Sequence, residues 1–295
     1  MKPTPPAIHN AFDILEAFQD GQREFTAQEF HKKLNISLST QYRVLHALED
    51  RGYLRRDTQT GRYRLGFKFL QVGNLALEQE EIVETSRGIL QDMCDETKET
   101  IQLGILEGVE VLYIKTIESP LPLRYVLQPG FRTPSYCVAA GKAILAYESE
   151  DKISRVIRAG LRRFTKKTIC TTTALKRELA DVRRGGYAVN WGEMRKSGRG
   201  VYAPVFDYSG RVAAAVGLSV PPERFTHKRL PSLAEVVRRC AEEISSRLGA
   251  VPLKTSATTG ENEAASLAEA PIRSKQRGGS NRKPEKSGRK NDTSG

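Results

Sequence analysis

Long apolar runs are absent from this chain of 295 residues. A helix that crosses a bilayer needs roughly 20 consecutive apolar residues, and no run approaches that length, so no membrane span is expected. The opening segment, 1–6, carries a lysine with no apolar stretch behind it, unlike a secretory signal peptide. We therefore expect a cytoplasmic protein with no membrane partner.

Cysteine and histidine are scarce, with four of each. They include no CxxC pair and no mixed cluster, and they stand at Cys94, Cys137, Cys170, Cys240, His9, His31, His46 and His227. Disulfide frameworks and zinc sites require paired or clustered residues of these types. We expect reduced thiols, no metal site and no cofactor.

Acidic residues are outnumbered, because 35 Asp and Glu stand against 47 Lys and Arg, for a formal net charge of +12. A basic excess suits a polyanionic partner, although a solvated basic surface is equally common. The length allows two domains, since single cores rarely grow beyond about 250 residues. The places where the charges fall are therefore more informative than their sum.

Helical periodicity dominates the beginning of the chain. A first helix is predicted over about 8–18, with one apolar face made of Ile8, Ala11, Phe12, Leu15 and Phe18. Thr26 and Glu29 form a capping-box pattern that opens a second helix, and Asn35 is suited to end it in the left-handed conformation. Two short helices in succession are therefore expected.

A third helix and a hairpin complete this region. The helix is predicted from about 37–39 to Gly52, with its buried side formed by Val44, Leu45 and Leu48. Strand-like runs follow at 53–56 and 62–65, separated by a loop rich in turn formers. Helix, helix, turn, helix and hairpin is the order of a winged helix-turn-helix, which we assign to residues 1–66.

The rest of the chain divides into three parts. A linker helix is predicted over 67–93, with Leu70, Leu75 and Leu77 on an apolar stripe. Residues 94–251 mix strands and helices without strict alternation, which favours an α+β domain on an antiparallel sheet. Its predicted strands lie at 100–106, 109–117, 201–206 and 212–220, and its helices at 138–147, 174–184 and 230–248.

Residues 252–295 are rich in Lys, Arg, Ser, Gly and Asn and almost free of large apolar residues. Such a segment buries too little surface to offset the entropy of ordering, so a disordered basic tail is expected. Its distal part, 273–290, could hold DNA without sequence preference by counterion release. A solubilising tail with no further task is the equal alternative.

The third helix carries the residues suited to read DNA. In a helix-turn-helix, the N-terminal residues of the second motif helix face base edges in the major groove. Here these are Ser39, Thr40, Gln41, Tyr42 and Arg43. A Gln can pair with adenine, and an Arg can pair with guanine or contact a phosphate. Among the wing arginines, Arg62 beside the turn is the best candidate for a backbone contact, with a solvated face as the competing interpretation.

At this point the sequence resembles the IclR family of bacterial regulators over about 8–248. In the first domain the resemblance rests on 11–16 (AFDILE), Ser39-Thr40-x-x-Arg43, Arg51-Gly52-Tyr53 and 60–66 (TGRYRLG). In the second it rests on Thr133-Pro134, 140–143 (AGKA), 184–187 (RGGY), 203–205 (APV) and 218–220 (LSV). Each motif alone is weak, but their order and spacing together are specific.

The resemblance implies a GAF-like effector-binding domain, assembly as a homodimer or dimer of dimers, and control of nearby catabolic or stress genes. It implies a double-stranded DNA operator as a partner, with RNA polymerase as a further candidate. Matched by position, the small-molecule pocket would include Tyr125, Ala139, Ala140, Asn190, Gly200, Gly217 and Ser219. The sign of regulation and the operator sequence do not follow from it.

Three of these positions depart from the polar set of the family's small keto-acid sites. Asn190 replaces an acidic residue, Gly200 a cysteine, and Gly217 one of two serines. Glycines in place of larger side chains would enlarge the cavity, and an amide in place of a carboxylate removes a charge. We therefore expect a larger, less polar effector, with an aromatic acid as one candidate.

Enzymatic chemistry finds little support. Gly141-Lys142 invites comparison with a phosphate-binding loop, but Tyr136 stands at the earlier glycine position and Ala143 replaces the Ser or Thr that would hold Mg²⁺. Cys137 has no base nearby in the sequence. A regulator is therefore predicted, rather than an enzyme; a Cys137-centred enzyme on the second domain and a sequence-independent nucleic-acid binder remain as alternatives.

Overall fold

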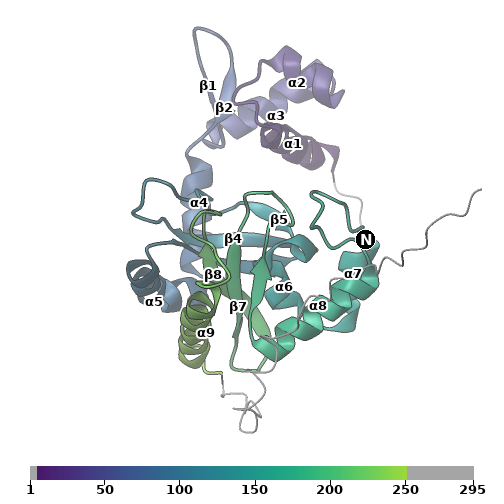
Figure 1. Cartoon of the computed structure of the whole chain (residues 1–295). Helices are drawn as coiled ribbons and strands as arrows, with labels where there is room; N and C mark the ends of the chain where they lie inside the picture. The colour runs from purple at the N-terminus through teal and green to yellow at the C-terminus, as the bar shows by residue number, and fades with distance from the viewer. Residues whose placement is uncertain (1–4, 251–295) are drawn as a thin grey trace, which may run out of the picture. The chain divides into compact units, whose positions relative to one another are not determined.

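The computed structural model describes residues 5–250, and the tail predicted at 252–295 lies outside them. The first elements form a three-helix unit with a two-stranded antiparallel hairpin (Figure 1). They are α1 (Pro6–Glu16), the 3₁₀ helix η1 (Ala17–Asp20), α2 (Ala27–Leu34), α3 (Leu38–Asp50), β1 (Leu54–Arg56) and β2 (Tyr63–Leu65). The predicted winged helix-turn-helix is confirmed.

Local capping fixes the turn between α2 and α3. The Glu29 backbone N–H donates to Thr26 Oγ1 at 3.2 Å, and the Thr26 N–H donates to Glu29 Oε2 at 2.7 Å, so the predicted capping box is present. Asn35 ends α2 with φ 53°, a left-handed conformation that Asn tolerates. Ser37 caps α3 by accepting from the Thr40 N–H. Asn35 and Ser37 therefore define the turn that leads into α3, while Thr26 and Glu29 fix the start of α2.

The predicted apolar face of the first helix is correct only in part: Phe18 is buried and Ala11 and Leu15 pack against the core, but the other two residues do not. Ile8 and Phe12 are 46% and 57% exposed, whereas Ile14, Ala17 and Phe18 are buried. Apolar residues cover more than one face of α1, so periodicity alone could not select the packed one. The chain also changes to a 3₁₀ turn after Glu16, which carries Phe18 into the core beside Ile14.

The predicted single linker helix over 67–93 is two helices, α4 (Lys68–Glu78) and α5 (Glu81–Thr97). They are separated at Glu80, whose ψ of 102° is extended rather than helical. No residue of α4 is buried, while α5 buries eight, Ile89 and Leu90 among them, in the core of the second domain. Only α4 is a linker in the packing sense, because α5 is part of that core.

A six-stranded, wholly antiparallel sheet forms the second domain, in the order β5-β4-β3-β8-β7-β6. Its strands are β3 (Thr100–Glu107), β4 (Glu110–Ile117), β5 (Arg132–Pro134), β6 (Ala188–Asn190), β7 (Gly200–Phe206) and β8 (Val212–Ser219). The expected α+β domain on an antiparallel sheet is confirmed. The short strands β5 and β6 were not predicted, since three residues give no alternation to detect.

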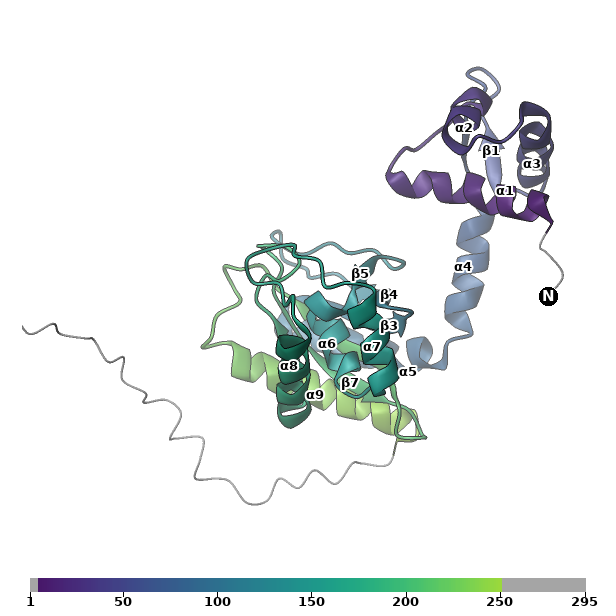
Figure 2. The ribbon, with the colours of Figure 1, turned by 90° about the vertical axis from the view of Figure 1, so that its right-hand side faces the viewer.

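Helices cover both faces of this sheet (Figures 1 and 2). One face packs on α5 and α9 (Leu230–Arg247), and the other on α6 (Ala139–Leu145), α7 (Glu150–Arg158) and α8 (Thr172–Gly185), with the 3₁₀ turn η2 (Ser135–Cys137) leading into α6. Side chains alternate along each strand, so Val201 and Ala203 face α9 while Tyr202 faces α6. The polar residues discussed below lie on the α6 face.

Candidate functional site

The exposed surface of α3 carries most of the predicted DNA-reading residues. Ser39 and Arg43 are exposed, Tyr42 is 51% exposed, and Thr40 is half-buried. Within residues 5–250, no ion pair engages the Arg43 guanidinium. These four side chains are available to a partner along one surface of the helix.

Gln41 departs from the prediction. Its side chain is fully buried, and its Nε2 donates to the Ala27 carbonyl of α2. It shares a helix face with the buried Val44, Leu45 and Leu48, so it lies on the packed side of α3 rather than outward. Gln41 is therefore unavailable to read a base, because its amide connects α3 to α2.

Arg62 is partly engaged within the domain. Its Nη1 lies 3.3 Å from Glu29 Oε2 and its Nε lies 3.6 Å from Glu24 Oε1, with one third of the side chain exposed. The Thr26 N–H, followed by the Arg62 charge, lowers the pKa of Glu29, so this carboxylate is ionised at neutral pH. Arg62 thus connects the hairpin to the capping box of α2, and any phosphate must compete with that pair.

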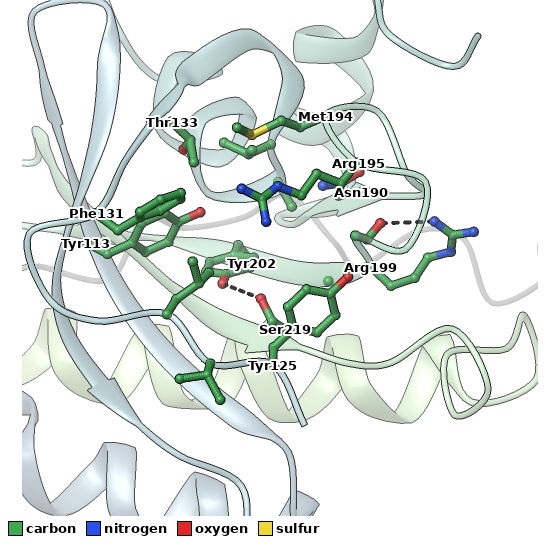
Figure 3. Close-up of a pocket in the computed structure, with 16 residues that line it drawn as sticks. Tyr113, Tyr125, Phe131, Thr133, Asn190, Met194, Arg195, Arg199, Tyr202 and Ser219 are labelled. Atoms are coloured by element: carbon green, nitrogen blue, oxygen red, sulfur yellow. Dashed lines mark hydrogen bonds between the residues drawn. The ribbon is translucent and has the colours of Figure 1, made fainter. Parts of the chain in front are cut away.

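The pocket predicted in the second domain lies on the α6 face of the sheet (Figure 3). It is a cavity of about 90 Å³, and five of the seven predicted residues line it: Tyr125, Ala139, Asn190, Gly200 and Ser219. The remaining lining residues are Tyr113, Val126, Leu127, Phe131, Thr133, Val138, Met194, Arg195, Gly198, Arg199 and Tyr202. Segments far apart in the sequence therefore meet at this site.

Two predicted residues do not line the cavity. Ala140 is fully buried in the packing of α6. Gly217 lies under the ring of Tyr202, where an added Cβ would overlap the ring and the Val201 carbonyl. The expectation that the glycines enlarge the pocket is wrong at this position, since Tyr202 occupies the space.

A buried hydroxyl network closes one end of the cavity. Tyr202 Oη donates to Gln102 Oε1 and lies 3.1 Å from Ser219 Oγ, which donates to the same Gln102 oxygen at 2.8 Å. Burial raises the pKa of Tyr202 well above its usual value and that of Tyr113 to about 12. Both phenols are neutral at physiological pH and act as hydrogen-bonding groups rather than as acids.

Two arginines of the loop before β7, Arg195 and Arg199, line the cavity. The Arg195 guanidinium points into the cavity (Figure 3) and has no carboxylate partner in the described part of the chain. Arg199 differs, because its Nη1 donates to the carbonyls of Lys196 at 2.8 Å and Gly198 at 3.0 Å. Arg195 is thus the cation best placed to meet an anionic ligand.

Several polar side chains at the cavity wall have unused hydrogen-bonding capacity, Thr133 Oγ1 among them. Asn190 Oδ1 accepts from the backbone N–H groups of Gly192 and Glu193, both at 2.9 Å, which fixes the orientation of its amide. The Tyr125 hydroxyl is buried and makes no hydrogen bond with the residues described. A buried hydroxyl without a partner is costly, so it marks a place where a ligand atom would be stabilised.

Lys142 has no role at a phosphate. It is 1% exposed, and its Nζ donates to Glu178 and Glu193, each at 2.7 Å, and to the Val189 carbonyl at 2.8 Å. Burial raises the pKa of Glu193, although Lys142 opposes the rise. All three donor positions of the ammonium are used inside the protein, which agrees with the rejection of a phosphate-binding loop.

The nucleophile alternative finds no chemical support at Cys137. Burial raises the pKa of its thiol to about 12, so the reactive thiolate is not formed at neutral pH. Across residues 5–250, no group of three or more His, Cys, Asp or Glu is arranged to hold a metal ion. The same part of the chain contains no helix with the length and apolarity needed to span a membrane.

Sequence reasoning missed Tyr113, Phe131, Arg195 and Tyr202. Tyr113 and Tyr202 come from strands that were predicted, but strand periodicity does not say which face meets a cavity. Phe131 lies between a turn and the short strand β5, and Arg195 lies in the loop between β6 and β7. No sequence signal marks a single arginine in a basic loop as directed inward.

Comparison with known proteins agrees with this architecture. Residues 7–58 match the family model described as the IclR helix-turn-helix domain, and residues 74–246 match that of the bacterial transcriptional regulator IclR C-terminal domain. The chain is 31% identical over 244 residues to the HTH-type transcriptional regulator KdgR of Escherichia coli, covering 82% of this chain and 92% of KdgR.

Solved structures extend the comparison. The Thermotoga maritima IclR structure is 31% identical, with a TM-score of 0.70, and the match covers 83% of this chain and 99% of that one. An IclR homologue from Microbacterium hydrocarbonoxydans, solved in complex with 4-hydroxybenzoate, has the same fold at 23% identity and a TM-score of 0.71. That match covers 82% of this chain and 98% of the homologue.

Proposed function

Because this chain belongs to the IclR family of bacterial transcriptional regulators, we propose that it binds an operator through α3 and that an aromatic carboxylic acid in the second domain modulates this binding. The observation that carries the proposal is the unpaired Arg195 guanidinium directed into a cavity lined by aromatic rings. Arg195 is exposed at the mouth of the cavity, and a charged donor without a carboxylate partner of its own favours a carboxylate ligand. The rings favour an apolar body over a small polar acid.

Three further features support this class of effector. Tyr125 and Asn190 offer hydrogen-bonding groups near the cavity that the protein itself leaves unused. Tyr113, Phe131, Val138 and Met194 supply apolar contact. The Microbacterium hydrocarbonoxydans homologue carries 4-hydroxybenzoate, an aromatic acid with one carboxylate and one hydroxyl.

On DNA, we assign base or phosphate contacts to Ser39, Thr40, Tyr42 and Arg43, with Arg62 as a phosphate contact. A homodimer would present two recognition helices to half-sites about 34 Å apart. Exposed apolar side chains on α1 and α4 are compatible with such an assembly, namely Ile8, Phe12, Leu70 and Leu75. This function places the protein with the chromosome, in agreement with the cytoplasmic location expected from the sequence.

The effector acts only if its affinity differs between two arrangements of the protein. The segment that carries Tyr125 is held where α5 meets the sheet, because Thr100 Oγ1 donates to the Tyr125 carbonyl at 2.8 Å. Arg224 donates to the Leu123 carbonyl at 3.0 Å and also pairs with buried Glu99. A ligand that moves this segment would therefore act on the C-terminal end of α5. Because α4 joins the N-terminal end of α5, a movement of the whole helix would change the spacing of the two recognition helices.

Titration calorimetry of the full-length protein tests the effector class. We expect 4-hydroxybenzoate or benzoate to bind more tightly than glyoxylate or pyruvate, and Arg195→Gln to weaken the aromatic acids about 10- to 100-fold, as for a lost charge-assisted hydrogen bond. Arg177→Gln, on the exposed side of α8, is the matched control and leaves affinity unchanged. Tight glyoxylate binding with no response to aromatic acids would contradict the proposal.

A mobility-shift assay on the upstream region of the protein's own gene tests the DNA half. At fixed salt and with competitor DNA, binding that survives competition and changes with the acid supports an effector-controlled regulator. Binding lost to any competitor would identify sequence-independent attachment instead. Transcription with RNA polymerase on the same fragment gives the sign of regulation.

A further inference from the structure

We propose that Tyr202 and Gly217 act as a matched pair that selects the effector, an inference that rests on the proposed function of the pocket. The two residues are directly opposite each other in the β7–β8 ladder, on the face of the sheet that lines the cavity. The Tyr202 ring lies across the Cα of Gly217, where a Cβ would overlap two of its ring atoms. The ring can lie here only because the opposite residue has no side chain, although the Val201 carbonyl also leaves no room for a Cβ at this position.

A second glycine allows the same placement. Gly200 is two residues before Tyr202, so both point to the same face of β7. A Cβ on Gly200 would lie 3.2 Å from Tyr202 Cε2 and 2.6 Å from the Leu218 carbonyl. The ring is thus seated between two positions without side chains, and any larger residue at either would displace it.

The hydroxyl network at Gln102 limits which polar groups a ligand can use. Tyr202 and Ser219 both direct their hydroxyl hydrogens to Gln102 Oε1. Ser219 lines the cavity, yet its donor is engaged within the protein. A ligand carboxylate at this end would have to break that bond, whereas the Arg195 end offers a donor with no partner of its own.

Orientation and selectivity follow from this arrangement. An aromatic acid can place its carboxylate at Arg195 and its ring against the Tyr202 side, gaining contact at both ends. A small 2-oxo acid fills only the Arg195 end and leaves the apolar wall uncovered. Tyr202 therefore acts against small polar acids by excluding volume, while Gln102 keeps the Ser219 donor engaged.

The test compares wild-type full-length protein with Tyr202→Ala, Gly217→Ser, the double variant and Tyr202→Phe. Glyoxylate and 4-hydroxybenzoate are the probes, with affinities from calorimetry. In the double variant, the ratio of glyoxylate affinity to 4-hydroxybenzoate affinity is expected to rise at least tenfold, because the aromatic ring is lost from the cavity wall and one serine hydroxyl is added where the ring lay. Tyr202→Phe keeps the ring and leaves the Ser219–Gln102 bond in place, so its affinity ratio is expected to stay within about twofold of the wild type.

Thermal unfolding of the same set tests the geometry independently. Gly217→Ser alone is expected to lower the Tm by about 5 °C or more, since 1 kcal/mol corresponds to about 2–4 °C in a domain of this size. Tyr202→Ala in the same chain should recover part of that loss, which is the signature of two residues competing for one space. Tyr147→Ala, in the same apolar cluster but outside the cavity, controls for packing loss without a change in selectivity.

The outcomes separate the inference from the proposed function. If the wild type binds 4-hydroxybenzoate but the double variant keeps the wild-type affinity ratio, the selector pair is overturned and the proposed function stands. If Gly217→Ser and Tyr202→Ala have additive effects on the Tm, the competition for space is overturned. If the wild type binds no aromatic acid, the proposed function fails and the selector role fails with it.

Discussion

The recognition surface of α3 and the cavity of the second domain are built in opposite ways. On α3, four candidate contacts lie within five consecutive residues, and Ser39, Tyr42 and Arg43 project from the domain without supporting it. In the cavity, Tyr113, Asn190, Tyr202 and Ser219 come from distant segments and are largely buried in one another's contacts. One site is added to a finished fold, and the other is part of the fold's interior.

This difference has a consequence for what each site tolerates. Surface substitutions usually change stability by less than about 0.5 kcal/mol, whereas buried polar or packing changes cost several times more. Operator preference can therefore change without loss of stability. A change in effector preference requires coordinated substitutions, because most single changes at the cavity also disturb packing.

The largest effect is expected inside the second domain, at Lys142 of α6. Lys142→Met leaves Glu193 buried without its counter-charge and is expected to destabilise the protein by about 3–5 kcal/mol at pH 8. The folded-state pKa of Glu193 is already raised by burial and rises further in the variant. Stability from its protonated form is complete below its unfolded pKa and is lost as pH rises through the folded pKa.

The loss in Lys142→Met is therefore smaller at pH 5 than at pH 8 when both are measured by urea unfolding. The control is Lys142→Met/Glu193→Gln, in which the extra pH dependence disappears. An equal loss at both pH values in the single variant would show that Glu193 is not the group left unpaired. It would also show that a buried charge pair does not make the second domain more sensitive to substitution than the surface of α3.

The middle effect separates two residues of α3 that are two positions apart. Gln41→Ala is expected to lower stability by about 1–3 kcal/mol, because the Ala27 carbonyl loses its buried donor. It leaves base preference unchanged. Arg43→Ala is expected to do the reverse, with stability within about 0.5 kcal/mol of wild type and a loss of about 1–3 kcal/mol in discrimination.

Unfolding curves and a panel of operator variants measure both quantities for this pair. Equal weakening on all DNA sequences in Arg43→Ala would assign the guanidinium to a phosphate rather than a base. A changed base preference in Gln41→Ala, at a temperature where the variant is folded, would contradict the structural role assigned to Gln41. Either result would reduce the difference between α3, where contact residues do not support the fold, and the cavity, where they do.

The smallest effect is expected at Arg62. This residue is partly exposed, like the contact residues of α3, and partly engaged inside its domain, like the residues of the cavity. Its pairs with Glu24 and Glu29 are partly exposed, so Arg62→Ala is expected to cost less than about 1 kcal/mol of stability. If it also contacts a phosphate, the slope of log K against log salt falls by about 1 unit. Arg158→Ala, in the second domain, is the control, and an unchanged slope for Arg62→Ala would confine it to its internal pairs.

Local signals account for what the sequence predicted well. The capping box at Thr26, the left-handed Asn35 and the adjacent strands predicted at 100–106 and 109–117 each depend on a few neighbouring residues, and all are present. The burial of Gln41 and the break at Glu80 depend instead on what packs nearby, which no local pattern contains. The first helix shows the same limit, because its apolar residues offered several faces and only the neighbouring helices select one.

The cavity shows how far matching by position extends. It placed Asn190, Gly200 and Ser219 correctly at the cavity wall, because strand register carries over between related chains. It gave the wrong consequence for Gly217, since an absent side chain can mean either empty space or space taken by a neighbour. The sequence contains Tyr202 and Gly217 but does not show that they are cross-strand partners until the strands are paired.

The break at Glu80 gives the chain a natural point of exchange. Every helix residue buried in the second domain's core lies after it, beginning with Ile82, while α4 contributes only the partly buried Leu77. A recombination event between related genes at 79–80 would thus transfer a complete operator-reading unit and keep the ligand-binding core intact. Operator specificity and effector specificity can therefore evolve independently of each other.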